Sequence, residues 1–184
     1  MGLIRSLFTK KPKYKTVNMI IDEKLINSND PQAVIDPVWW SVSIYDSEEK
    51  YEEDLKPFTL HQRYVFAIQW YVAEVNNGGH NQFYTNSTGI VWEDALKGFE
   101  AIGALKNVNI IKESADRIGG KPSKDRDERN KQLKQSCGDN EDCDLFDDLD
   151  DSYYESESEM YELLNAYIKA NAKDFIFSGE ICIP

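Results

Sequence analysis

Apolar residues along most of the chain recur every three or four positions, which is the period of an amphipathic helix. The clearest case is "TLHQRYVFAIQWYVAEVNNGG", where Thr59 and Gln62 form a capping-box pair and Gly78 and Gly79 mark the end. No stretch of useful length alternates with the period of a strand. The pattern therefore predicts an all-α fold, a single globular multi-helix domain.

Two shorter helices are predicted near the start of the chain. "VNMIIDEKLINSND", residues 17–30, has apolar residues at helical spacing, and Pro31 ends that pattern. Asp36 is the expected N-cap of the next helix, with Pro37 at its first position.

The last helix is predicted to begin at a second capping-box pair, Ser152 and Glu155. Helical spacing assigns its buried face to Tyr154, Tyr161, Leu164, Tyr167 and Ile168. Before it, residues 121–136 are strongly polar, which is typical of an exposed helix or a mobile connector. After it, "FIFSGEICIP" is interpreted as a terminal tail.

Length and residue types narrow the class of protein. The 184 residues suffice for one domain, divided here into a basic arm (1–16) and a helical domain (17–184) with a polar and acidic insert at 121–150. "MGLIRS" also fits an acylation pattern that would bring the arm to a membrane. No apolar run approaches the ~20 residues of a membrane span, so we expect a cytoplasmic protein.

Cysteine and histidine usage argues against structural metal or disulfide chemistry. The three cysteines, Cys137, Cys143 and Cys182, form no framework spacing, so a disulfide scaffold is not expected. The two histidines cannot complete a convincing zinc site. The run "DNEDCDLFDDLD" lacks the glycine and glutamate of an EF-hand. We predict no metal site and no cofactor.

Charge is distributed very unevenly. The chain carries 33 acids against 21 bases, and residues 139–162 hold twelve acids and no base. If wholly helical, this run would span ~36 Å, or one charge per ~3 Å, close to the 3.4 Å per phosphate of one DNA strand. It suits a basic partner protein rather than nucleic acid itself, although a solvated surface is the alternative. The candidate partner-binding residues are Asp142, Asp144, Asp147, Asp148, Asp150, Asp151, Glu155, Glu157 and Glu159.

The stretch "EVNNGGHNQFYTNSTG", residues 74–89, concentrates polar side chains and glycines. As a catalytic or small-ligand site it would use Glu74 or His80 as a base and amides as donors, but it lacks a nucleophile and a phosphate-binding loop. As a structural motif it would end a helix and satisfy the backbone groups freed there. We favour the structural interpretation, carried by Glu74, Asn76, Asn77, Gly78, Gly79, Gln82, Phe83 and Asn86.

The same stretch, followed by "ALKGFEAIGA", "FDDLDDSYYE" and "LLNAYIKANAKDF", resembles a DNA-mimic protein family, a helical domain of unknown function. The similarity covers about residues 55–177. It implies a mainly bacterial, all-helical domain without established catalytic activity, in which at least one member imitates DNA and captures a DNA-binding protein. We therefore expect a non-enzymatic acidic binding protein. An immunity-type protein against a basic toxin, an enzyme or ligand binder using residues 74–86, and a homodimer remain open.

Overall fold

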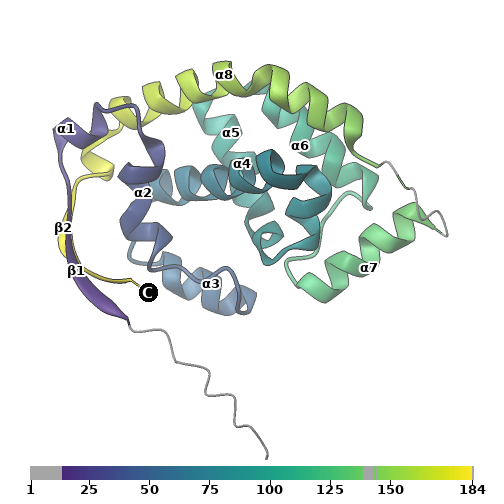
Figure 1. Ribbon diagram of the computed structural model, residues 1–184, viewed down its shortest axis with the longest axis horizontal. Helices are drawn as coiled ribbons and strands as arrows, with labels where there is room; N and C mark the ends of the chain where they lie inside the picture. The colour runs from purple at the N-terminus through teal and green to yellow at the C-terminus, as the bar shows by residue number, and fades with distance from the viewer. Residues whose placement is uncertain (1–13, 139–142, 144, 184) are drawn as a thin grey trace, which may run out of the picture.

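Most of the described chain folds into helices, as the sequence predicts (Figure 1). The computed structural model describes residues 14–138, 143 and 145–183. Its helices are α1 (Glu23–Ile26), α2 (Pro31–Trp39), α3 (Glu48–Leu55), α4 (Leu60–Thr85), α5 (Trp92–Ile102), α6 (Leu105–Arg117), α7 (Arg126–Cys137) and α8 (Asp147–Ala170). Two short 3-10 helices, η1 (Ser87–Val91) and η2 (Ala172–Asp174), follow α4 and α8.

Helix α4 forms the centre of the core, with α2, α5, α7 and α8 packed around it. The ring of Tyr71 on α4 is fully buried and contacts three other aromatic rings edge to face. The ring centroids lie 5.0 Å from Phe83, 5.2 Å from Phe99 and 5.7 Å from Tyr153. Because these rings come from α4, α5 and α8, one aromatic cluster joins the three helices.

The start of α4 confirms the predicted capping box. The Thr59 hydroxyl accepts from the backbone N–H of Gln62 at 3.2 Å, and the Gln62 side chain accepts from the Thr59 N–H at 2.9 Å. Two N–H groups that the helix cannot pair are thereby satisfied.

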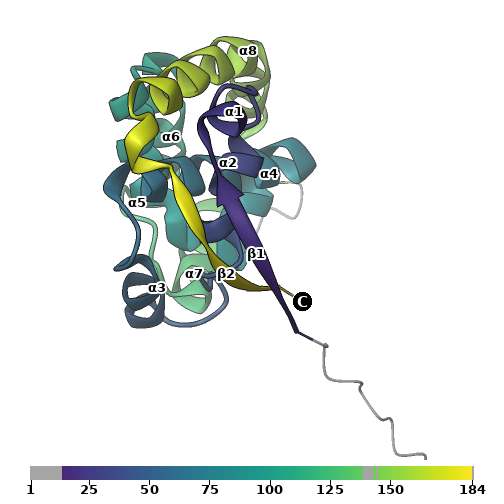
Figure 2. The ribbon, with the colours of Figure 1, turned by 90° about the vertical axis from the view of Figure 1, so that its left-hand side faces the viewer.

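The helix predicted over residues 17–30 is wrong for the first part of that range, which is a strand, and only Glu23–Ile26 of it is helical. β1 (Lys15–Ile21) pairs antiparallel with β2 (Phe177–Ile183), and Figure 2 shows the two strands side by side along one flank of the helices. Val17, Ile20 and Ile21 are β-branched and favour extended backbone. The C-terminal tail supplies the partner strand from the other end of the chain, which local periodicity cannot reveal. The two strands are the exception in a fold that is otherwise α-helical.

The predicted boundary between the first two helices is also wrong. Asp30 is the N-cap of α2 and accepts from the Ala33 N–H at 3.0 Å, so Pro31 begins a helix instead of ending one. Asp36 and Pro37 lie inside α2. Both Asp-Pro pairs carry the same local signal. The earlier one is used because it brings Val34, Ile35 and Val38 into one buried face.

Helix α8 begins at Asp147, earlier than the predicted capping box. Ser152 lies within the helix, where its hydroxyl donates to the Asp148 carbonyl at 2.8 Å. The buried face of α8 runs through Leu149, Tyr153 and Met160, so Tyr153 is buried and Tyr154 is 48% exposed, contrary to our prediction. Leu164 and Ile168 are buried as expected, whereas Tyr161 and Tyr167 are half-buried.

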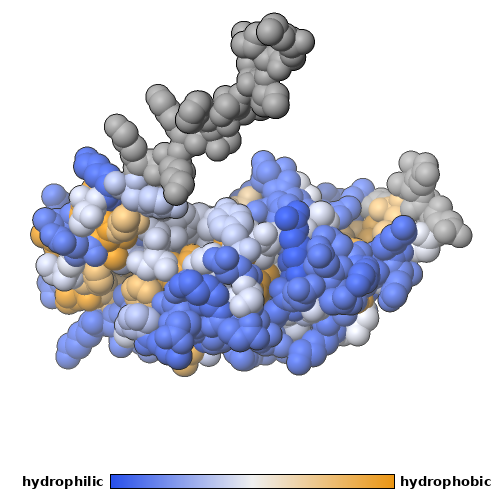
Figure 3. All heavy atoms as spheres, turned by 90° about the horizontal axis from the view of Figure 1, so that it is seen from below, coloured by the Kyte–Doolittle hydropathy of each residue, from blue (hydrophilic) through white to orange (hydrophobic). Residues whose placement is uncertain are grey.

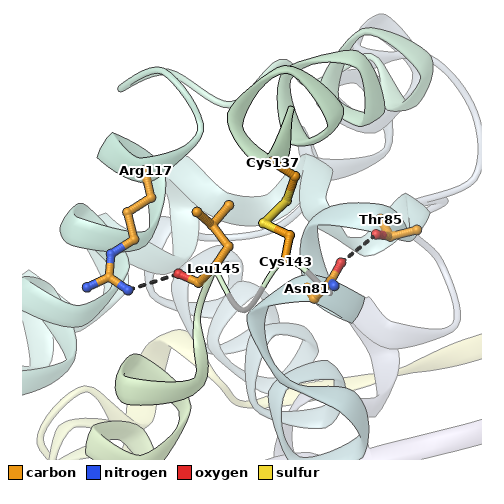
Figure 4. The surroundings of a disulfide bond; sticks show 6 residues. All are labelled: Asn81, Thr85, Arg117, Cys137, Cys143 and Leu145. Atoms are coloured by element: carbon orange, nitrogen blue, oxygen red, sulfur yellow. Dashed lines mark hydrogen bonds between the residues drawn. A yellow bond between two sulfur atoms is a disulfide. The ribbon is translucent and has the colours of Figure 1, made fainter. Parts of the chain in front are cut away.

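The polar segment before α8 forms helix α7, and a disulfide joins the end of this helix to the segment that leads into α8 (Figure 4). Cys137 and Cys143 are bonded, with their Cα atoms 5.5 Å apart, a single disulfide that our expectation of no disulfide scaffold did not foresee. The expectation rested on framework spacing, whereas this bond closes a single local loop. Nearby, Arg117 donates to the Leu145 carbonyl at 2.9 Å. Cys182 on β2 is free and exposed.

Candidate partner-binding surface

Helix α4 is interrupted at the two glycines of the polar motif. Gly78 (φ −166°, ψ 32°) and Gly79 (φ 69°, ψ −174°) are not helical, but helical backbone resumes at His80 and continues to Thr85. The glycines therefore break the helix, as predicted, without ending it. Gly79 has the left-handed backbone that glycine adopts without strain. A Cβ atom at Gly79 would also collide with the carboxylate of Asp150 on α8.

Side chains of α8 satisfy backbone groups at this break. The Asp150 carboxylate accepts from the backbone N–H of His80 at 2.9 Å and from His80 Nδ1. The Tyr154 hydroxyl donates to the Val75 carbonyl at 3.1 Å. Asn76 donates to the Glu157 carboxylate at 2.5 Å. The break in α4 is therefore one of the points where α8 is held against the core.

The His80 side chain is fully buried at the centre of this contact. Asp150 accepts from Nδ1, so in the neutral ring Nε2 accepts from the Tyr71 hydroxyl, 2.5 Å away. Burial raises the pKa of Tyr71 well above its usual value, which keeps that hydroxyl protonated as a donor. With no exposed surface, the imidazole acts here as a link between α4 and α8.

Glu74 connects the two sides of the break within α4. Its carboxylate accepts from the Gln82 amide at 2.7 Å and from the Asn86 amide at 2.9 Å. Phe83 is buried in the aromatic cluster, whereas Asn77 is exposed. Glu74 therefore links the part of α4 before the two glycines to Gln82 and Asn86 after them. These hydrogen bonds stabilise the broken conformation of the helix.

Two neighbouring acids of α8 provide a test of this structural role. We expect Asp150→Asn to lower the free energy of unfolding by about 2–3 kcal/mol, since it removes a charged acceptor from two donors. Asp151→Asn should change it by less than about 0.5 kcal/mol, because Asp151 is exposed. Urea denaturation of both variants measures the difference. Equal effects would contradict the role assigned to Asp150.

A second test compares two glycines with positive φ. Gly79 has φ 69° and faces Asp150, whereas Gly103 has φ 80° and a Cβ atom there would meet no heavy atom within 4 Å. Alanine at Gly103 (φ 80°, ψ 17°) carries the left-handed backbone strain of about 1 kcal/mol, whereas the backbone of Gly79 (φ 69°, ψ −174°) lies in a region essentially limited to glycine and is more costly for alanine. We expect Gly79→Ala to cost about 2 kcal/mol more than Gly103→Ala, because only Gly79→Ala both adopts this backbone and displaces Asp150. Similar melting temperatures for the two variants would exclude a tight contact at Gly79.

The outer face of α8 carries a row of exposed carboxylates, which we call the acidic stripe. Its members are Asp148, Asp151, Glu155, Glu159 and Glu162. Successive members are three or four residues apart, so they lie on one face of the helix. The stripe spans ~21 Å, or one charge per ~5 Å, which is sparser than the 3.4 Å per phosphate of a DNA strand. The density of one charge per ~3 Å expected from the sequence is therefore too high for a single face.

Bases of α6 neutralise part of the acidic stripe. Arg117 forms a two-pronged ion pair with Asp148, with one N–O distance of 2.7 Å, and this guanidinium lowers the pKa of Asp148. Lys106 pairs with Glu159 at 2.8 Å. Within the described part of the chain, Asp151, Glu155 and Glu162 have no ion-pair partner. These three are the carboxylates available to an incoming base.

The predicted partner-binding residues therefore fall into different environments. Asp142 and Asp144 lie outside the described residues, and Asp147 is exposed at the first turn of α8. Asp150 faces the break in α4, and Glu157 is half-buried beside Asn76. Our candidate set omitted Glu162, although its spacing from Glu155 and Glu159 already placed it on the outer face.

A buried arginine fixes α7 beside the same motif, and sequence reasoning missed it. Arg129 has no exposed surface and donates to the carbonyls of Tyr84 at 2.7 Å, Asn86 at 2.6 Å and Ser123 at 2.6 Å. Burial lowers its pKa to about 10, so the side chain is charged at neutral pH. Tyr84 and Asn86 lie at the carboxyl end of α4, where carbonyl dipoles favour a cation. Gly89 leaves room for the guanidinium, because a Cβ atom there would overlap it.

A shallow cavity of about 460 Å³ adjoins the break in α4. Gly78, Asn81, Phe146 and Asp150 are among its lining residues. In the ranges that the structure describes, no three His, Cys, Asp or Glu side chains are grouped so as to hold a metal ion. No helix in those ranges has the length and apolar character needed to cross a membrane.

Comparison with known proteins identifies one family that this chain matches. The model of the DMP19-like protein family matches residues 56–171, which is more than half of the chain. The matched part begins just before α4 and includes every element from α4 to α8, and so the break and the acidic stripe. No curated protein and no solved structure matches the chain significantly.

Proposed function

This chain belongs to the DMP19-like protein family, and from that premise we propose that it is a non-enzymatic protein that captures a basic DNA-binding protein. The observation that carries this proposal is the acidic stripe on α8. Five exposed carboxylates share one helix face, and three of them lack an ion-pair partner among the described residues. A protein surface built to hold phosphates presents lysine and arginine in an array that such carboxylates can occupy.

Rigid presentation of the acidic stripe supports this function. Helix α8 is held to the core by Asp150, Tyr154 and the buried side chains of its inner face. The stripe therefore needs little ordering when a partner binds, which lowers the entropic cost of association. A surface that only keeps the protein soluble does not require its charged helix to be held in one position. The fixed position of α8 therefore favours a binding interface over a surface that only aids solubility.

The experiment uses DNA itself as the competitor. The immobilised protein is exposed to the heparin-binding protein fraction of the native host, washed, and eluted with duplex DNA or with the same mass of an uncharged polymer. We expect duplex DNA to release a retained protein that the polymer leaves bound. Retention of a nuclease toxin that the chain inhibits would instead support an immunity-type protein, and retention of nothing would contradict capture.

A small-ligand or catalytic site at the break remains the alternative, because the cavity beside Gly78 offers space for one. The adjoining side chains are engaged in holding helices: Asp150 to His80, and Glu74 to two amides. The alternative predicts that Asn81→Ala, a change at the cavity wall, abolishes function in the native host. Our proposal predicts that this variant retains partner capture, since it leaves every carboxylate of the acidic stripe unchanged.

A further inference from the structure

Tyr154 presents an aromatic ring at the surface of α8, beside the acidic stripe. The residue is 48% exposed, whereas the neighbouring Tyr153 is fully buried. The Tyr154 hydroxyl donates to the Val75 carbonyl at 3.1 Å, and its ring packs against that of Tyr153 with the centroids 5.7 Å apart. The ring is therefore held in one place from two sides, while about half of the residue faces solvent.

Three carboxylates lie close to this ring. Asp150 and Asp151 are one turn before Tyr154 on α8, and Glu157 is one turn after it. Burial, and then the charges of these three acids, raise the pKa of the Tyr154 hydroxyl, which keeps it protonated as a donor. In the described part of the chain, no lysine or arginine pairs with any of the three acids. Their negative charge is therefore available to a base of another molecule.

The break in α4 adds negative potential at the same place. Asp150 and Glu157 accept from the backbone N–H of His80 and from the side-chain amide of Asn76, and neither of these donors carries a charge. The helical part of α4 before Gly78 also ends here, and the carbonyl end of a helix carries a partial negative charge. Its last four residues, "EVNN", include no base. Both helices therefore favour a cation beside the ring.

The same chain shows which cation fits a ring and a carboxylate together. The Arg63 guanidinium lies 5.6 Å from the ring centroid of Tyr51 and pairs with Asp94 at 2.8 Å. Arginine suits this arrangement because its planar, weakly hydrated guanidinium can lie on an aromatic face and bond a carboxylate along its edge. Among the residues that the structure describes, no arginine or lysine lies over the Tyr154 ring in this way.

We propose that Tyr154 and Asp151 form an arginine-binding site, in which a guanidinium of the partner lies over the exposed ring and donates to the Asp151 carboxylate. The inference rests on the proposed function in that the arginine belongs to the captured basic protein. It adds selectivity, because carboxylates attract lysine and arginine alike, whereas the ring favours the guanidinium over a strongly hydrated ammonium. Arginine is also the residue that DNA-binding surfaces commonly use for bidentate contacts to phosphate and guanine.

Two peptides of equal charge test this selectivity on the full chain. The probes are hexaarginine and hexalysine with acetylated and amidated ends, and the arginine preference is the ratio of their dissociation constants, measured by titration calorimetry at low salt. We expect the wild type to bind hexaarginine about threefold more tightly, or better. Tyr154→Leu should lower this ratio about twofold or more. Tyr154→Phe should keep it, because phenylalanine retains the ring and loses only the hydrogen bond to Val75.

Tyr45→Leu is the matched control. Tyr45 is 75% exposed and lies shortly before α3, where residues 46–54 include six acids. Helix α3 is on the side of the molecule away from α8 (Figure 1), and Figure 3 shows that side largely covered by hydrophilic residues. We expect this variant to keep the arginine preference, because bases of the chain already pair with Glu48 and Asp54 there.

Equal affinity of the wild type for the two peptides would overturn the proposal, and so would an arginine preference that Tyr154→Leu retains or that Tyr45→Leu loses to the same extent. Equal loss of the preference in Tyr154→Phe and Tyr154→Leu would also overturn it, since the effect would then come from the hydrogen bond to Val75 and not from the ring. The proposed function fails by a different result, the absence of a captured basic partner, which the peptide titrations do not require.

Discussion

Neutralising the three unpaired carboxylates of the acidic stripe, in the variant Asp151→Asn, Glu155→Gln, Glu162→Gln, is expected to weaken partner binding by about tenfold or more. Each exposed charge pair contributes about 0.2–1 kcal/mol, so three together reach this size. The free energy of unfolding should be unchanged or slightly higher, because acids four residues apart on a helix repel each other. Titration calorimetry with the captured partner measures the loss.

A matched control removes the same charge elsewhere. Glu23→Gln, Asp127→Asn and Glu180→Gln lie on α1, α7 and β2, where all three acids are exposed. This variant has the same net charge as the stripe variant, so it separates local contacts from the overall field. We expect it to bind within about twofold of the wild type at physiological ionic strength, where distant charges are screened. Equal weakening by the two variants would mean that only net charge matters.

Replacing the buried arginine has the largest expected effect on stability. Arg129→Met should lower the free energy of unfolding by about 3–5 kcal/mol, because it leaves several carbonyls without a donor at a fully buried site. Arg129→Lys should recover only part of the loss, since an ammonium group cannot reproduce the planar fork. Denaturant unfolding with tryptophan fluorescence as the signal measures both variants.

The neighbouring Arg126 is the control for this prediction. It also donates to a carbonyl at the end of α4, that of Thr85 at 2.9 Å, but its side chain is exposed. Arg126→Met should therefore cost less than about 1 kcal/mol. A similar cost for the two arginines would show that burial of Arg129 contributes little, and that α7 is held mainly by other contacts such as the buried Leu133.

The parts of the fold that follow local rules could be predicted. Thr59 and Gln62 cap α4 because both signals lie within one turn, and the helical period of α4 is carried by its own residues. β1 could not be predicted in this way, since its partner is the far C-terminal segment. The start of α2 was misplaced because two Asp-Pro pairs give equal local signals, and tertiary burial of Val34 and Ile35 decides between them.

In the candidate site too, features set by local sequence could be predicted, whereas features set by tertiary contacts could not. Asp151, Glu155 and Glu159 were among the predicted partner-binding acids, and all three are exposed. Asp150 carries the same chemistry as Asp151 but turns toward His80, because the break at Gly79 opens a backbone donor to it. The residues next to Asp150 in the sequence do not indicate that its carboxylate accepts a hydrogen bond from α4. Arg129 was missed for a similar reason, since its acceptors are backbone carbonyls of other elements.

The most direct test of the proposed function asks whether the partner can hold DNA and this protein together. A fluorescently labelled duplex is bound to the captured partner and titrated with the wild-type chain while anisotropy and native mass are followed. If the acidic stripe occupies the DNA-binding surface, the duplex is released completely, no ternary complex forms, and the stripe variant requires about tenfold more protein for half-release. A stable ternary complex with the duplex still bound would contradict DNA mimicry by this chain.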